Sequence, residues 1–169
     1  MHHSDTGSTF AHVSKRMSDN EVRRFLSSGT RTGKLATVRP DGSPHVVPIW
    51  FVVDDSGPDW SLVFNTGRDT VKGRALRNDA RVSICVDDEE PPFAYVRIDG
   101  EADLSDDVDE MLPWSTRIAA RYMGPDQADA YGRRNAVDGE LLVRVKPTKA
   151  VALSGIADEV DAADVRSPR

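Results

Sequence analysis

Cations and hydroxyl groups gather around one predicted helix start in the segment 63–81, which is the part of the sequence best suited to chemistry. An apolar strand runs into a Thr-Gly turn, and a short helix then begins near Thr66, Arg68, Thr70, Lys72 and Arg74. The first turn of a helix exposes backbone N–H groups and the positive end of the helix dipole. Cations and hydroxyls added there are typical of a site for a phosphorylated ligand.

Each of these residues also has a simpler interpretation. Lys72 and Arg74 can form the solvated face of a short helix, and Thr66 and Thr70 can serve as helix caps. However, cations at the start of a helix oppose its dipole unless an anion lies nearby. We therefore favour the phosphate site, and a capping hydroxyl can also donate a hydrogen bond to a phosphate.

Length and composition restrict the classes of function. The chain has 169 residues, 30% of them charged, and a net charge of −6, which suits one domain with an acidic surface. Such a balance disfavours a general nucleic-acid role, which usually needs a basic face. No apolar run reaches membrane-spanning length and no apolar signal core is present, so we expect a cytoplasmic protein without a membrane partner. The single cysteine, Cys85, is interpreted as a small buried hydrophobe, and we expect no metal site.

The first half of the chain predicts one helix and then strands. We expect a flexible arm over 1–16 and a capping box at Ser18 and Glu21 that opens a helix ending at Gly29. Strands are predicted over 34–39, 45–53 and 60–65, and the short helix over 70–77. The 45–53 strand is apolar at nearly every position, so both of its faces should be covered, one by the barrel interior and the other by a ligand or a second subunit. Pro48 within it indicates a sheet edge or a bulge.

The second half continues this hairpin order. Strands are predicted over 81–87 and 94–104, with a bulge at Gly100. A helix over 106–123 should break near Pro113, and a short helix should follow over 126–135. Two closing strands, 141–145 and 149–153, should flank a turn at 146–148, and the tail over 156–169 should be disordered. These elements predict a mainly β protein with helices, built as an antiparallel barrel over 17–155.

Two segments resemble a known family. Residues 33–51 and 64–81, in this order and spacing, are similar to the pyridoxamine 5′-phosphate oxidase-like superfamily of flavin-binding split barrels. The likeness covers about 18–154 and is greatest to the actinobacterial branch that uses the deazaflavin coenzyme F420. It implies a homodimer with two cofactors in grooves between the subunits. It also implies a ring system lined by Val47, Pro48, Ile49 and Trp50, and a phosphate held by Thr66, Arg68, Lys72 and Arg74.

The sequence also departs from that family. True pyridoxamine phosphate oxidases carry an arginine and a lysine where this chain has Val47 and Val52. They also have a C-terminal segment rich in arginine, tryptophan and proline that is absent after Gly155. Both departures argue against pyridoxine phosphate chemistry.

Other polar and aromatic residues stay open to two interpretations. Trp50 is either a core side chain or a wall of the cofactor site, and His45 is interpreted as structural. The second half of the chain holds a group that forms either a solvated helix face or a contact for a tail of glutamates: Arg117, Arg121, Tyr122, Arg133 and Arg134. No catalytic triad or carboxylate pair is evident, which is expected if the cofactor performs the chemistry and the protein orients it.

Three functions follow from the sequence. The first is an oxidoreductase that uses reduced coenzyme F420 as hydride donor to an unsaturated or heteroaromatic small molecule. The second is an oxidoreductase that uses FMN at the same phosphate site. The third is a carrier that binds a flavin, a deazaflavin or a haem-like ligand without turnover, since a fold does not determine a function.

Overall fold

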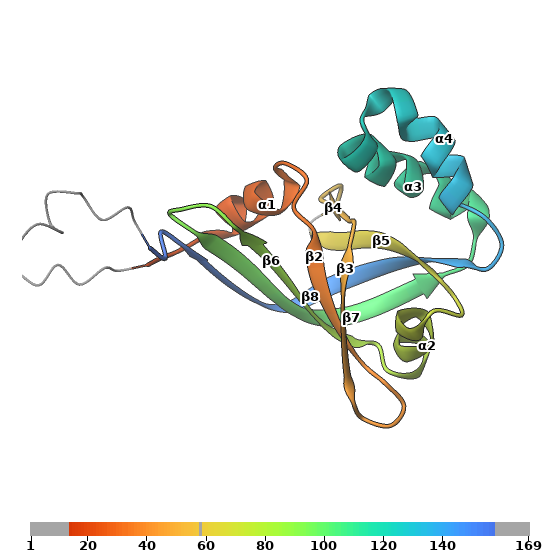
Figure 1. Cartoon of the computed structure of the whole chain (residues 1–169), viewed down its shortest axis with the longest axis horizontal. Coiled ribbons are helices and arrows are strands. Elements are labelled where there is room, and N and C mark those ends of the chain that lie inside the picture. Colours follow the sequence, from red (N-terminus) through yellow and green to blue (C-terminus); the bar gives the residue numbers. More distant parts are fainter. Residues whose placement is uncertain (1–13, 58, 158–169) are drawn as a thin grey trace, which may run out of the picture.

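One curved antiparallel sheet forms the body of the protein (Figure 1). The structure is a computed structural model that describes residues 14–57 and 59–157. Its strands are β1 (Lys15–Arg16), β2 (Gly33–Val38), β3 (Pro44–Ile49), β4 (Val52–Asp54), β5 (Ser61–Gly67), β6 (Arg81–Asp88), β7 (Ala94–Ser105) and β8 (Glu140–Ser154). The strand order is β3-β2-β6-β7-β8-β5-β4, and β1 pairs with β8. The two ends of this order, β3 and β4, follow each other in sequence but do not pair, so the barrel is open between them.

The helices of the described chain lie around this sheet. They are α1 (Asp19–Ser27), α2 (Val71–Asn78), α3 (Val108–Met123) and α4 (Pro125–Asn135). In Figure 1, α3 and α4 lie together at one end, while α2 lies near the start of β6. The predicted mainly β, antiparallel architecture with helices is therefore confirmed.

The alternation of apolar and polar side chains along the strands produces the main hydrophobic core. Leu35, Ile84 and Ile98 come from β2, β6 and β7 and are fully buried beside Phe64 and Val143 of β5 and β8. The inward side of these strands is apolar, and the outward side carries polar groups. Helix α1 closes one end with the buried Val22 and Leu26, and the predicted capping box of Ser18 and Glu21 is present.

The predicted strand over 45–53 is wrong in one respect, because the chain leaves the sheet at Trp50 and Phe51. The N–H of Phe51 donates to the Tyr122 hydroxyl (3.2 Å), and its carbonyl accepts from the Arg121 guanidinium (2.8 Å). Side chains of α3 thus replace the ladder partners that a continuous strand would need. Pro48 lies in the edge strand β3, one of the two positions that we predicted, and a proline is tolerated there because an edge strand has a ladder partner on one side only.

The predicted turn at 146–148 is also wrong, since β8 runs through it as one strand of fifteen residues. Its first part lies between β5 and β7, and beyond Val145 it keeps β7 on one side until β1 joins at Leu153. Pro147 is tolerated because this stretch has a partner on one side only. The predicted bulge at Gly100 is confirmed: the register shifts between Asp99 and Gly100, and the Thr148 hydroxyl donates to the Asp99 carbonyl (3.0 Å).

Helix α3 is continuous through Pro113, where we predicted a break. Pro113 lies in the second turn, so only the single hydrogen bond to the Asp109 carbonyl is lost. Met111, Ser115 and Ile118 are buried on either side of it, and this packing keeps the helix in one piece. Helix α4 lies directly against α3, because Gly132 has no side chain to collide with Thr116.

At the two ends, the sheet takes in Lys15 and Arg16 from the expected arm over 1–16. Ile156 and Ala157, at the start of the expected tail, donate their N–H groups to the carbonyls of Phe93 and Pro92 (both 3.1 Å). The rest of the arm and of the tail, 1–13 and 158–169, lies outside the described residues.

Gly100→Ala should destabilise the fold by about 1–3 kcal/mol, a typical cost of overpacking. A Cβ at this position would lie 2.5 Å from the Lys146 carbonyl oxygen, a backbone atom that the bulge holds in place. Urea unfolding followed by circular dichroism measures the change, with Glu101→Ala at the neighbouring exposed position as control. A Gly100→Ala variant within about 0.5 kcal/mol of that control would contradict this account.

Candidate functional site

The start of α2 is held tightly against the end of β5. Thr70 is the N-cap: its hydroxyl accepts from the Gly73 N–H (3.1 Å) and contacts the Thr66 hydroxyl (3.1 Å). A Cβ on Gly73 would collide with the carbonyls of Gly67 and Arg68, so only glycine allows this approach. The cap serves Gly73, and α-helical geometry leaves the N–H groups of Val71 and Lys72 outside the intrahelical bonds. Thr70 is therefore the cap, and Thr66, which is only 3% exposed, contacts the capping hydroxyl from β5.

A cavity of about 250 Å³ lies beside this helix start. It brings together four of the predicted site residues, although two of them belong to the end of β3, one follows that strand and one belongs to α2. Its lining consists of Pro48, Ile49, Trp50, Asn65, Lys72, Ile118 and Asn135. The lining therefore offers a cation and two amides together with apolar and aromatic walls. This combination suits a ligand with a phosphate or another anion at one end and a planar group at the other.

The remaining predicted residues do not line this cavity. The Arg68 guanidinium forms a salt bridge with Asp106 (2.9 Å), and the Arg74 guanidinium donates to the Asp69 carbonyl. Val47 is half-buried and lies on the same face of β3 as the buried Ile49. The cations that we grouped from the sequence are thus separated, and Lys72 is the one that lines the cavity.

Trp50 forms a half-exposed wall of the cavity. Its ring stacks on Tyr122 of α3 with the centroids 4.9 Å apart and the planes 2° from parallel. It remains 41% exposed, so it is not a core side chain. The hydroxyl of Tyr122 also donates to the Arg31 carbonyl (2.9 Å) while it accepts from the Phe51 N–H.

The arginines of α3 and α4 that we grouped from the sequence have different contacts and roles. Arg121 is structural, because its guanidinium donates to the carbonyls of Leu26 (2.8 Å), Gly29 (2.9 Å) and Phe51. Burial lowers the pKa of Arg121 and raises the pKa of the Tyr122 hydroxyl. Arg117 lies over the ring of Trp114 (4.3 Å) and Arg134 over that of Tyr131 (5.6 Å), while Arg133 is exposed. The Nδ1 atom of His45 lies 3.0 Å from the Arg39 guanidinium.

Asn65, Ile118 and Asn135 line the cavity but were missed from the sequence. Asn65 gives a recognisable signal, because it is an amide within a strand whose neighbours Phe64 and Thr66 are buried. Its Nδ2 is buried and has no hydrogen-bond partner in the described part of the chain. Such a group costs free energy unless something accepts its hydrogen, so a ligand oxygen would fit here. Ile118 and Asn135 carry no comparable signal, since only the folding of α3 and α4 brings them to this place.

Glu140, at the start of β8, is the acidic neighbour of Lys72. Burial raises the pKa of its carboxyl group, and the charge of Lys72 acts in the opposite direction. No ion pair within 4.0 Å of the Lys72 ammonium is found among residues 14–57 and 59–157. The ammonium is therefore available to an anion in the cavity.

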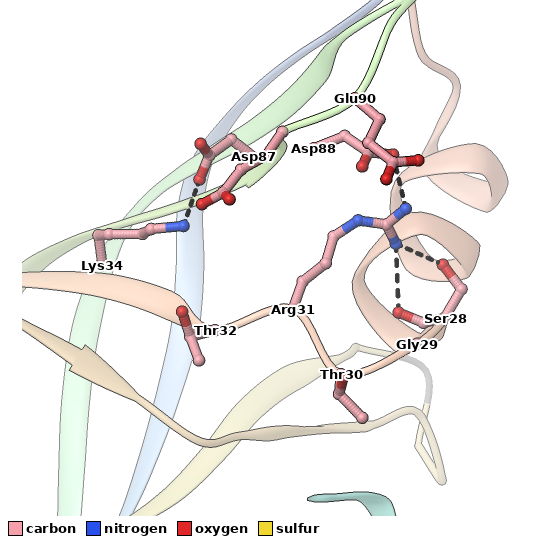
Figure 2. A pocket seen from close by; sticks show the side chains of 10 residues that line it. Ser28, Gly29, Thr30, Arg31, Thr32, Lys34, Asp87, Asp88 and Glu90 are labelled. Carbon is pink, nitrogen blue, oxygen red and sulfur yellow. Dashed lines mark hydrogen bonds and ion pairs between the residues drawn. The ribbon is translucent and has the colours of Figure 1, made fainter.

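A larger, polar cavity of about 520 Å³ lies between the end of α1 and the β6–β7 turn. Figure 2 shows the side chains of Arg31 and Lys34 pointing toward carboxylates across this cavity. Arg31 pairs with Asp88 (2.7 Å) and Lys34 with Asp87 (2.5 Å). Since each cation already has a carboxylate partner, this cavity is a poor anion site and the smaller one remains the candidate.

The family model described as pyridoxamine 5′-phosphate oxidase matches residues 18–152. Among characterised proteins, a 5a,11a-dehydrotetracycline/5a,11a-dehydrooxytetracycline reductase of Streptomyces rimosus is 42% identical over 59 residues. That match covers 33% of this chain and 39% of the reductase, so less than half of the relative is represented.

Solved structures share the fold over most of the chain. A conserved hypothetical protein of Mycobacterium tuberculosis is 26% identical with a TM-score of 0.71, over 82% of this chain and 86% of its own. A structure titled F420 reductase is 27% identical with a TM-score of 0.59, over 75% of this chain and 94% of its own. A haem storage protein of Vibrio cholerae, at 19% identity and a TM-score of 0.62 over 82% and 96% of the two chains, is similar in fold alone.

Two further observations concern the described part of the chain. None of its helices is long and apolar enough to cross a membrane. Within the same residues, no three His, Cys, Asp or Glu side chains gather where they would hold a metal ion.

Glu140→Gln should raise stability more at neutral pH than at pH 4. The pKa of Glu140 is higher in the folded state, so the folded protein binds more protons and loses stability as the pH rises through that pKa. The glutamine removes this loss, and the gain in melting temperature at pH 7 should be at most about 2–4 °C. Melting curves at both pH values test it, with Glu101→Gln at an exposed site of β7 as control. A gain that is larger at pH 4 would reverse the assignment.

Proposed function

Because this chain belongs to the pyridoxamine 5′-phosphate oxidase family, we propose that it is an oxidoreductase that uses reduced coenzyme F420. The hydride acceptor would be an unsaturated or heteroaromatic small molecule. The observation that carries the proposal is the 250 Å³ cavity, where Lys72 and Asn65 lie beside the wall of Pro48, Ile49 and Trp50. Two similar proteins are named for F420 or for reduction, and this supports the choice.

The residues of the cavity fit such a cofactor. Lys72 would neutralise a phosphate, and the amide of Asn65, whose Nδ2 lacks a partner in the described chain, would donate to one of the ligand oxygens. Pro48, Ile49 and Trp50 would lie along the ring, and Ile118 would exclude water from the opposite side. The cofactor supplies the hydride, so the task of the chain is to bind the ring and orient it toward the substrate.

The other predicted site residues have secondary roles in the proposed cofactor site. Arg68 and Arg74 would contact a phosphate or an anionic tail only after giving up their present partners. The salt bridge between Arg68 and Asp106 is exposed on both sides, so exchanging it for another anion costs little. Thr66 would act through the Thr70 cap, and Val47 through its place in β3.

A homodimer with the cofactor at the interface is part of the same proposal. Val46 is 61% exposed in the edge strand β3, between Pro44 and Pro48, which are also exposed. An exposed apolar edge strand next to the cavity would be covered by a second copy of the chain. Sedimentation at micromolar concentration measures the mass directly, and a stable monomer would remove the shared cofactor site.

Lys72→Ala should weaken the binding of F420 and of FMN by about 1.5–3 kcal/mol, the range of a charge-assisted hydrogen bond. The affinity would therefore fall about 10- to 150-fold, with little change in unfolding. Fluorescence quenching or titration calorimetry measures it, and Lys149→Ala, at an exposed position of β8, serves as control. If the variant bound both cofactors as tightly as the wild type, the phosphate would lie elsewhere.

F420 should bind more tightly than FMN, and its affinity should fall more steeply with salt. The reason is that its polyanionic tail adds contacts to exposed arginines, and salt screens such contacts. Binding curves for both cofactors between low and physiological ionic strength test the choice. Tighter FMN binding at every salt concentration, together with turnover on reduced FMN alone, would select the FMN-dependent alternative.

A further inference from the structure

Trp50 is a large aromatic side chain that remains partly exposed. The indole lies where the chain has left the sheet, it lines the cavity, and 41% of it remains exposed. One face is covered by Tyr122, with ring planes within 2° of parallel. An indole that stacks on Tyr122 and is still 41% exposed, at the wall of a cavity that Lys72 also lines, offers a stacking surface to a planar ligand group.

Tyr122 fixes the position of this surface. Its hydroxyl is tied to two backbone groups, the Arg31 carbonyl (2.9 Å) and the Phe51 N–H (3.2 Å). These bonds come from two separate segments and fix the position of the hydroxyl, while the stacking contact with Trp50 orients the plane of the ring. The guanidinium of Arg121 lies 5.1 Å from the same ring and holds the Phe51 carbonyl. The lower layer of the stack is therefore in place before any ligand arrives.

We propose that Tyr122 is a positioning residue that presents Trp50 as the stacking platform for the planar ring of the cofactor, in a three-layer stack of ligand ring, Trp50 and Tyr122. The inference rests on the proposed function and adds a role for α3 that the family match does not assign. An electron-rich indole favours an electron-poor heteroaromatic ring, which is the chemical class of flavins and deazaflavins. Because Trp50 is already ordered, little conformational entropy is lost when the ring binds.

If Tyr122 had a structural role alone, substitutions at this position would give a different experimental result. In that case Tyr122 would only satisfy the backbone at the break between β3 and β4, and its removal would change stability but not the contact with the ring. The two roles separate when ring binding is measured apart from phosphate binding. Riboflavin and the deazariboflavin chromophore of F420 carry the ring without a phosphate, while FMN and F420 carry both.

The experiment compares the affinities of these four ligands for the full chain by fluorescence quenching. The ligands form two pairs, FMN with riboflavin and F420 with deazariboflavin. Trp50→Leu and Tyr122→Leu should each lower the affinity for both members of a pair by the same factor, about tenfold, as expected for the loss of one aromatic stacking contact. Lys72→Ala should lower the affinity only for the phosphorylated ligand. Tyr122→Phe keeps the ring stack and should retain the affinity for riboflavin and deazariboflavin, while its melting temperature falls because the Phe51 N–H loses its acceptor.

The outcomes distinguish this inference from the function on which it rests. If Trp50→Leu and Tyr122→Leu kept wild-type affinity while Lys72→Ala lost it, the cofactor site would stand and the stacking platform would be wrong. If the wild type bound none of the four ligands, both proposals would be overturned. If Tyr122→Leu does not fold, Trp50→Leu and Tyr122→Phe still test the inference. Positioning through the stack predicts that Tyr122→Phe keeps its affinity for the ring. A loss of ring affinity in Tyr122→Phe as large as the loss in Trp50→Leu would contradict it.

Discussion

Two side chains of α3 satisfy the backbone where the barrel opens, and most of the candidate site depends on this. A strand that stops pairing leaves donors and acceptors that must find other partners. At Phe51 these partners are the hydroxyl of Tyr122 and the guanidinium of Arg121. The same two side chains also bind carbonyls at the end of α1 and before β2, at Gly29 and Arg31. The opening between β3 and β4 is thus held by a helix that comes much later in the sequence, and Trp50 is directed toward the cavity as a result.

The partners of each cation near the start of α2 determine which of them is available to bind an anion. Arg68 has Asp106 as its partner, and Arg74 donates to the backbone carbonyl of Asp69. Lys72 has no ion pair within the described part of the chain, and Glu140, whose own pKa burial raises, attracts it over a longer distance. A cation without a close counterion, near the N–H groups of a helix start, attracts an anion more strongly than one that is already paired. The difference between the three cations is therefore one of their partners and not of their place in the sequence.

The pair of helices α3 and α4 completes the cavity because it is fastened to the sheet at several points. Ile118 packs with Val63 and Leu142 of the sheet. Arg144 of β8 bridges Asp54 (3.1 Å) and Glu110 (3.0 Å), and its guanidinium lies over the ring of Trp114 (4.7 Å). Hydrogen bonds from Ser105 and Arg144 lower the pKa of Glu110, which keeps this bridge charged at neutral pH. With the helices held in this way, Ile118 and Asn135 reach a cavity whose other walls come from β3, β5 and α2.

The sequence by itself determined the local elements and pointed to Lys72 and Trp50 as candidate site residues. Capping signals, strand alternation and the glycine at the bulge act over a few residues, so the α1 capping box, the edge position of Pro48 and the bulge at Gly100 were all predictable. Only the tertiary structure decided the break at Trp50, the continuity of α3 through Pro113 and the single long strand β8. In each of these the local signal was overruled by partners distant in sequence: side chains of α3, buried packing on both sides of the proline, and the long pairing with β7. The tertiary structure also decided that Asn135 lines the cavity and that Arg68 and Arg74 have partners of their own, because these contacts depend on which surfaces meet once the sheet has folded.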